Sequence, residues 1–228
     1  MSQLKIITKQ AVDALQEVLP QIARGVSRQS TRAKKKIVAM SKAIKDKDLE
    51  LASRVRRHDV PPHRRTELDV DIPGFRNRRG YDQGEFDDQV REQLDTLQDM
   101  SMLEWIARRG RYADGGRPSA SRAAQQAARD QAEIDHLTEL LDAGVDYDDA
   151  LAQTSSWMSS QAALHRLDGV AGGNVTDISG LGAGGINSSI GGQWSSRIRQ
   201  IDIAVADFVQ SNPGIDLSTV FMNVTQLP

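Results

Sequence analysis

Two residue types that can do acid–base or metal chemistry stand three positions apart in the stretch LHRLDGVAGGN, residues 164–174. The imidazole of His165 and the carboxylate of Asp168 can bind one metal ion together, or the imidazole can act as a general base that the carboxylate orients. The sequence does not choose between these roles. The glycines that follow let the backbone turn away without covering the pair. These glycines are Gly169, Gly172 and Gly173.

An H-x-x-D spacing on its own also fits a buried, hydrogen-bonded histidine near the end of a helix. The patterns around the other histidines give less support for a chemical role. His136 stands three residues before Glu139 on a segment with an apolar stripe, which favours a structural role, and His58 and His63 lie in a linker where no chemistry is expected. The sequence contains no Walker, nucleophile-elbow or H-E-x-x-H pattern.

Composition narrows the chemistry further. The chain has 228 residues and no cysteine, which excludes disulfides, thiol nucleophiles and thiolate metal sites. A metal must then be held by carboxylate, imidazole, amide or carbonyl groups, which favours hard or borderline metal ions. No apolar run approaches the roughly 20 residues of a membrane span, and a signal peptide's apolar core is missing. We therefore expect synthesis in the cytoplasm and export by another route.

The formal net charge of −2 hides two regions of opposite sign. Residues Met1 to Arg65 contain 16 Lys plus Arg and 6 Asp plus Glu, a net charge of +10, whereas Thr66 to Pro228 carry −12. We place a boundary at residue 65, between a basic helical N-terminal extension (1–65) and a second domain (66–228). The extension is either a solvated arm folded against an acidic body or a contact surface for nucleic acid or a delivery partner.

The spacing of apolar residues predicts a mainly α-helical fold with one small two-stranded β element. Helical spacing predicts two basic helices in the extension, at residues 3–27 and 31–57. Alternating apolar residues predict short strands at Leu68–Ile72 and Val220–Val224. We expect these two strands to pair and to join the ends of the domain.

Every element predicted between the two strands is a helix. A helix at Glu85–Met100 is followed by a capping-box pattern, Ser101 with Glu104, ahead of a helix that Gly110 ends. An alanine-rich helix then runs to about Asp142, where Gly144 stops it.

The predicted site follows the next helix, which Asp146 caps and which carries His165 near its end. Nine of the chain's 18 glycines fall between Gly169 and Gly192, a density that predicts a long, ordered loop rather than a regular element. The last predicted helix begins near Trp194 and ends at Asn212.

Several longer strings resemble one toxin family. LHRLDGVAGG, followed by INSSIGGQW and a helix beginning RIRQID, is similar to the polymorphic toxin type 15 domain. EFDDQVREQLDTLQDMSMLEWIARRGRY, at 85–112, resembles the opening segment of that family. The resemblance covers about residues 66–212. It implies a largely helical toxin whose H-x-x-D motif falls on His165 and Asp168.

The resemblance also implies an activity and partners. Members of this family act as DNases that are delivered into competing bacteria, often by type VI secretion, and are neutralised by a cognate immunity protein. We expect DNA hydrolysis in the target-cell cytoplasm with a divalent ion, Mg²⁺, held by His165 and Asp168, after delivery by secretion machinery or a chaperone. The family's N-S-S-I-G-x-Q-W string implies residues that line the site or anchor its loop: Asn187, Ser188, Gln193 and Trp194.

A domain with a charge of −12 repels DNA unless a bound cation, nearby arginines or the basic extension offset that charge. The candidates for phosphate contact, which also fit surface charge, are Arg108, Arg109, Arg111 and Arg117. Two other functions stay open: a non-enzymatic interaction or adaptor protein whose loop contacts a partner, and a toxin of the same fold that acts on RNA or nucleotides.

Overall fold

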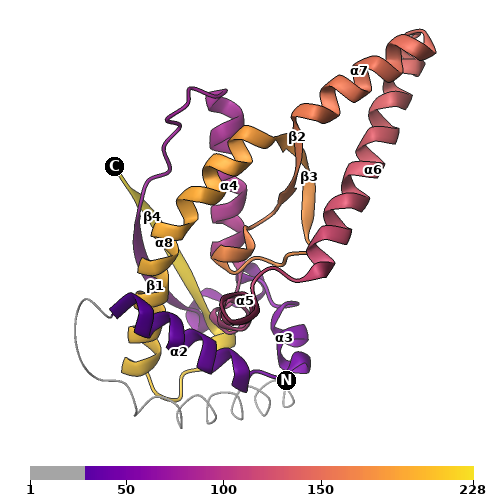
Figure 1. Cartoon of the computed structure of the whole chain (residues 1–228). Helices are drawn as coiled ribbons and strands as arrows, with labels where there is room; N and C mark the ends of the chain where they lie inside the picture. The colour runs from indigo at the N-terminus through magenta and orange to yellow at the C-terminus, as the bar shows by residue number, and fades with distance from the viewer. Residues whose placement is uncertain (1–28) are drawn as a thin grey trace.

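The computed structural model describes residues 29–228, and the helix predicted at 3–27 lies outside this range (Figure 1). The mainly α-helical fold is confirmed. No helix in the described range is long and apolar enough to cross a membrane. The helices are α2 (Gln29–Ala43), α3 (Asp46–Ala52), α4 (Gln83–Asp99), α5 (Met102–Gly115), α6 (Ser119–Asp142), α7 (Tyr147–Ser160) and α8 (Gly184–Ser211). The strands are β1 (Thr66–Pro73), β2 (Gln161–His165), β3 (Ile178–Ala183) and β4 (Val220–Leu227). Short 3₁₀ turns occur at η3 (Arg57–Asp59), η4 (Pro62–Arg64), η5 (Gly169–Ala171) and η6 (Leu217–Thr219).

The strand pair predicted from alternation is present and is parallel. β1 pairs with β4 in a register that sets Leu68 opposite Met222 and Val70 opposite Val224. Parallel neighbours need a crossover connection, and here everything from α4 to α8 forms that connection. The pair therefore joins the two ends of the helical domain, as the sequence predicted.

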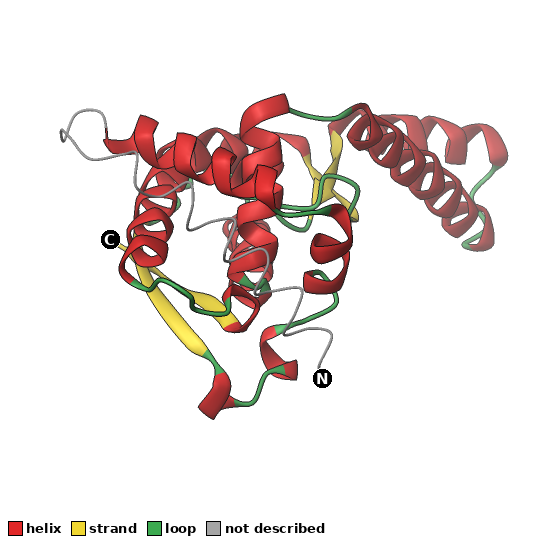
Figure 2. Ribbon diagram, turned by 90° about the horizontal axis from the view of Figure 1, so that it is seen from below, coloured by secondary structure: helices red, strands yellow, loops and turns green. Residues whose placement is uncertain are grey.

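Helices α4, α5 and α8 pack against this strand pair, α2 packs on α5 and α8, and together they form the core (Figures 1 and 2). Trp105 of α5, Trp194 of α8 and Phe86 of α4 are completely or almost completely buried. Burying one large apolar side chain contributes roughly 1.5–3 kcal/mol, so these residues hold the helices at fixed positions. The core is therefore the frame to which the remaining elements attach.

Part of the predicted basic extension shares this core. Ile37 and Met40 of α2 are buried against α5 and α8, and Lys36 donates a 2.8 Å hydrogen bond from Nζ to Gln210 Oε1. The helix predicted at 31–57 is divided into α2 and α3, with η3 following. A chain shortened to begin at residue 66 would lose these apolar contacts, whatever else the extension does.

Gly110 does not end a helix, contrary to the prediction. It lies inside α5 where α2 crosses, and a Cβ at this position would stand 2.2 Å from the Ser41 side chain. α5 continues to Gly115 and is followed by Gly116, whose φ of 72° suits only glycine well. The glycine at position 110 therefore serves close helix packing. The predicted cap at the other end is present, because the Ser101 hydroxyl accepts a hydrogen bond from Glu104 N.

The glycine-rich stretch is not a long loop, and His165 is not on a helix. α7 ends at Ser160, in a serine-rich segment where the Ser159 and Ser160 hydroxyls bond to carbonyls of the preceding turn. The chain then forms an antiparallel hairpin, β2 with β3, that the sequence analysis missed. α8 begins at Gly184 rather than near Trp194, because burial of Ile186 and Ile190 on its inner face outweighs the low helix propensity of glycine.

Helices α6 and α7 form an antiparallel hairpin that projects from the core (Figures 1 and 2). The predicted turn signals are confirmed. Gly144 has a φ of 82° after α6, and the Asp146 carboxylate accepts a hydrogen bond from Asp148 N at the start of α7. The base of α6 packs on the β2–β3 hairpin, so this arm supplies residues to the surroundings of His165.

Candidate functional site

His165 is the last residue of β2 and points toward α6. Its side chain is buried, and Gln125 Nε2 of α6 lies 2.8 Å from His165 Nε2. Rotation of the Gln125 amide by a half-turn would place its oxygen there, so that His165 Nε2 donates the hydrogen bond. His165 Nδ1 is buried and makes no hydrogen bond of good geometry among the described residues, although the backbone of Asp177 is close enough to raise the pKa of the ring. An unpaired buried ring nitrogen is costly, and such groups are typical of functional sites.

Asp168 caps η5 immediately after the strand. Its Oδ1 accepts a 2.8 Å hydrogen bond from Val170 N, and its backbone N donates to Gln93 Oε1 at 3.3 Å. The Asp168 carbonyl accepts from Ala171 N at 2.9 Å and from Gly173 N at 3.0 Å. The other carboxylate oxygen, Oδ2, faces Gly191 of α8, where a Cβ would lie 3.2 Å away. The carboxylate is thus held by one oxygen, and the second faces a backbone without a side chain.

The three glycines after Asp168 are required by close packing. A Cβ at Gly169 would stand 2.6 Å from the Tyr112 ring, and one at Gly173 would stand 1.8 Å from Leu167 O. Gly172 has a left-handed φ of 98° and lies against Trp105. The chain therefore turns tightly under Asp168 instead of opening into a flexible loop.

Burial and charge keep the His165 imidazole neutral. Burial lowers the pKa of His165 below its ordinary value of 6.5, and the positive charge of Arg117 lowers it further. The carboxylates of Asp168 and Asp177 raise the same pKa, but burial is the largest effect. A neutral imidazole at pH 7 can accept a proton or bind a metal ion.

The first turns of α6 contribute residues that the sequence analysis did not select. Gln125 contacts the His165 ring, and Ser121, one helical turn earlier, is completely buried with no partner for its hydroxyl among the described residues. Gln93 of α4 accepts hydrogen bonds from Asp168 N and, at 2.6 Å, from Trp194 Nε1. No motif marks these residues, because each acquires its role only when distant helices meet.

The four arginines proposed for phosphate contact are in different surroundings. Arg109 is buried and makes two hydrogen bonds to Asp202, at 3.0 and 2.8 Å, so it is removed from the phosphate candidates. Arg111 bonds to Asp46 and to the Ile44 carbonyl on the α3 side. Arg117 is exposed and acts on the His165 charge, which leaves it as a candidate.

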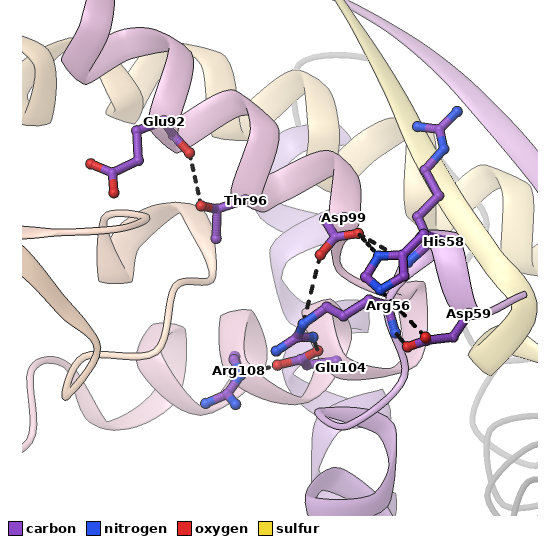
Figure 3. A network of polar contacts seen from close by, with 9 residues as sticks. Arg56, His58, Asp59, Glu92, Thr96, Asp99, Glu104 and Arg108 are labelled. Atoms are coloured by element: carbon purple, nitrogen blue, oxygen red, sulfur yellow. Dashed lines mark hydrogen bonds and ion pairs between the residues drawn. The ribbon is translucent and has the colours of Figure 1, made fainter.

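Arg108 belongs to a network that fastens the 56–59 segment to the core (Figure 3). Its Nε donates to Glu104 Oε1 at 2.8 Å, and Arg56 Nη1 donates to the other oxygen of the same buried carboxylate at 2.9 Å. Asp99 accepts from Arg57 N, and exposed His58 lies 3.9 Å from the same carboxylate. Arg108 and His58 therefore take part in structural contacts.

This network closes one end of a groove of about 840 Å³ between α4 and the β2–β3 hairpin. Alternate residues of a strand face opposite sides, so Leu164 and Arg166 line the groove and His165 faces away from it. Seven acidic residues line the groove: Glu85, Asp88, Glu92, Asp95, Asp99, Glu104 and Asp177. Four arginines also line it, namely Arg56, Arg91, Arg108 and Arg166, so the lining keeps a small net negative charge, which does not favour a nucleic acid backbone.

The family-string residues divide between the core and a second pocket. Trp194 is buried and packs edge-on against Phe75, so it anchors α8. Ser188 and Gln193 line a pocket on another side of α8, of about 1020 Å³, and Asn187 is half-buried. His165 and Asp168 line neither of these two pockets, so the expected cleft around the pair is not formed by either.

The carboxylate of Asp168 suits a hard divalent ion, and the imidazole of His165 suits a borderline one. Within residues 29–228, no group of three or more His, Asp or Glu side chains has metal-ligand geometry. Mg²⁺ commonly binds through only one or two protein carboxylates and completes its shell with water and substrate phosphate oxygens. Oδ2 of Asp168 fits that mode as an oxygen ligand, and Nδ1 of His165 would be the nitrogen ligand of a borderline divalent ion.

A helical domain that holds an imidazole and a carboxylate on a tightly packed turn agrees with the polymorphic toxin class implied by the sequence. The sequence model of a family described as Novel toxin 15 matches residues 81–217, which is more than half of the chain. The chain belongs to the Novel toxin 15 family. The match contains α4 to α8 and both residues of the H-x-x-D motif. No curated protein matches the chain.

Proposed function

We propose that this toxin domain is a metal-assisted DNase that hydrolyses DNA phosphodiesters in competitor cells after secretion, and that a cognate immunity protein neutralises it. One observation carries the proposal: a buried His165 whose Nδ1 has no partner lies within electrostatic reach of Asp168, in a chain of this toxin family. Most buried polar side-chain atoms in proteins have a hydrogen-bond partner, so an unbonded buried ring nitrogen favours a role beyond packing.

Phosphodiester hydrolysis needs a nucleophilic water, neutralisation of the charge that grows on the phosphate, and help for the leaving oxygen. Neutral His165 would accept the proton of water at Nδ1, or would bind the ion at that atom, while Gln125 fixes the ring through Nε2. Asp168 would use Oδ2 for the ion or for orienting water, since Oδ1 is held by Val170 N. A bound divalent ion would supply the positive charge that phosphate oxygens require.

The direct test compares plasmid DNA incubated with purified full-length protein in Mg²⁺ and in Mg²⁺ plus EDTA. We expect nicking and linearisation only without EDTA, and no cleavage by His165→Ala at matched metal. Cleavage of RNA but not DNA in parallel samples would replace DNA by RNA as the substrate. A folded wild-type protein that cleaves neither would favour the non-enzymatic adaptor role.

Toxicity and the immunity partner are tested in cells. Expression of the domain in a bacterial cytoplasm should stop growth, and co-expression of the neighbouring reading frame should restore it. His165→Ala should be harmless while still binding the immunity protein, because the substitution removes chemistry rather than surface. Loss of binding in a folded His165→Ala protein would place the immunity contact on the histidine itself.

A further inference from the structure

The second pocket, of about 1020 Å³, has a strongly basic lining. It lies between the chain segment 73–81 and the first half of α8 (Figure 1). None of the described residues that line it is Asp or Glu. Four arginines contribute to the lining: Arg76, Arg78, Arg79 and Arg197.

Arg197 is a buried cation at the base of this pocket. Only 5% of it is exposed, and its guanidinium carbon lies 4.1 Å from the centroid of the Phe75 ring. It donates hydrogen bonds to the carbonyls of Gln193 and Gly74, and its Nε has no partner among the described residues. Burial lowers the pKa of Arg197, and the charges of Arg76 and Arg78 lower it further. The fold therefore places the positive charge of Arg197 near those of Arg76 and Arg78, although these like charges repel one another.

The backbone that carries the exposed arginines is fixed in place. Gln193 accepts a hydrogen bond from Arg76 N at 2.9 Å and donates one to Arg76 O at 3.1 Å. The next residue, Asn77, makes hydrogen bonds to both backbone groups of Tyr81, four residues further on: its side chain accepts from Tyr81 N at 3.0 Å and donates to Tyr81 O at 2.8 Å. Arg76 and Arg78 thus project from an ordered segment, and ligand binding would not have to order it.

The opposite wall is the first part of α8, where small residues leave the backbone accessible. The helix starts at Gly184 and Gly185, and its N-cap, Ala183, provides no side-chain hydrogen bond. The free N–H groups and the dipole of a helix start favour an anion. Gly192 also lines the pocket, and a Cβ there would meet nothing within 4 Å. The Glu85 carboxylate accepts a hydrogen bond from Ala183 N at 2.7 Å but does not line the pocket, so arginines on one wall and the helix start on the other still favour an anion inside it.

We propose that this pocket binds a backbone phosphate of the DNA substrate, outside the hydrolytic centre. The inference rests on the proposed DNase function. Among the described residues, Arg109 and Arg111, two of the arginines first considered for phosphate, are paired with carboxylates. Gly191 lies beside Asp168 and Gly192 lines the pocket, so consecutive residues of α8 border the two sites. A DNA strand held here would be anchored next to the groups that act on it.

The first test measures DNA binding without cleavage. Fluorescence anisotropy with a short labelled DNA duplex, in EDTA and in a His165→Ala background, would compare Arg76→Gln/Arg78→Gln with Arg122→Gln/Arg199→Gln. The second pair removes the same charge from exposed positions elsewhere. We expect the pocket pair to weaken binding by about tenfold or more, and the slope of log Kd against log salt to fall by ~1. Equal losses in both pairs would overturn the proposal.

The second test changes the charge inside the pocket at constant size. Gly192 has open space, so Gly192→Gln and Gly192→Glu both fit, and either residue favours a helix more than glycine does. We expect Gly192→Glu to bind DNA about tenfold more weakly than Gly192→Gln, because its carboxylate occupies the anion site. Equal affinities of the two variants would contradict the proposal.

A third arm separates DNA from a free anion. Inorganic phosphate and a mononucleotide would be titrated against thermal stability in the same variants. If the pocket variants lose stabilisation by the free anion but keep full DNA affinity, the pocket serves a small phosphate ligand and the DNA assignment is wrong. Binding losses in a protein that never cleaves DNA would instead refute the proposed DNase function and leave the phosphate site standing.

Discussion

His165 and His136 have the same spacing to an acidic residue in the sequence, but their rings lie in different surroundings in the structure. Each stands three residues before an acidic residue, Asp168 or Glu139. His136 lies in the last third of α6, stacks on Trp157 with ring centroids 4.3 Å apart, and has Thr154 Oγ1 3.2 Å from its Nδ1. His165 ends a strand, is buried, and keeps Nδ1 without a partner in the described chain.

The difference shows that spacing does not decide whether a histidine can do chemistry. On the regular helix, Glu139 is exposed and His136 is satisfied by a packing partner and a hydroxyl. At the junction of β2 and η5, the change of backbone direction brings an unsatisfied imidazole and a held carboxylate into one charged neighbourhood. The spacing along the chain is the same, but in the described chain His165 is the one of the two with a ring nitrogen that is both buried and unbonded.

The largest effect is expected from removing the pair itself. His165→Ala and Asp168→Ala should each lower the rate of plasmid cleavage by roughly 10² or more, the scale of losing a general base. The double variant should be little worse than the worse single one, as for residues that act as a unit. Circular dichroism would check the fold. If folded single variants cleave at the wild-type rate, His165 has only a structural role, as His136 does.

A smaller effect is expected when Asp168 loses its support. Gln93→Leu removes the acceptor for Asp168 N and Trp194 Nε1, and should lower kcat by about 10-fold, with KM little changed, as for other groups that orient a catalytic side chain. Gln93→Glu keeps an acceptor oxygen and should restore much of kcat. If both variants lose activity only in proportion to lost folded protein, Gln93 is structural.

The pH dependence of cleavage should follow the protonation of His165. Because burial and Arg117 lower the pKa of His165, the acid limb of kcat/KM should lie below 6.5. Arg117→Gln should move that limb to higher pH, and Asp177→Asn to lower pH. The unfolded chain binds this proton more readily than the folded chain, so stability should also fall as pH drops below about 6.5. An acid limb unaffected by both substitutions would assign it to another group.

The smallest effect is expected at His136. His136→Ala loses the Trp157 stack and the Thr154 contact, which should destabilise the α6–α7 arm by about 1 kcal/mol. Cleavage should stay within about twofold of wild type, because the contacts of His136 are with Trp157 and Thr154 and not with His165 or Asp168. A loss of cleavage comparable to that of His165→Ala would show that the arm belongs to the reaction centre.

The sequence predicted elements with a strong period and missed those decided by packing. α4, α6 and the β1–β4 pair follow long apolar patterns and clear caps. β2 and β3 have few large apolar residues and many glycines, so their alternation is weak, and the helical start of α8 depends on burial of Ile186 and Ile190. His165 and Asp168 were selected from the sequence, but Gln93 was not, since it meets Asp168 across 75 residues.

The pairing of β1 with β4 also sets the order in which the protein can be completed. Asp69 and Asn223 are 154 positions apart, and their side chains join across the two strands at 2.9 Å. Ribosomal synthesis must supply everything between them before β1 finds its neighbour, and contacts of such long range form slowly. Gln98 of α4 accepts a hydrogen bond from Val224 N, so the helix that supports Asp168 through Gln93 waits for the same strand. In a cell that makes this toxin, the domain can therefore be completed only after β4 has been translated.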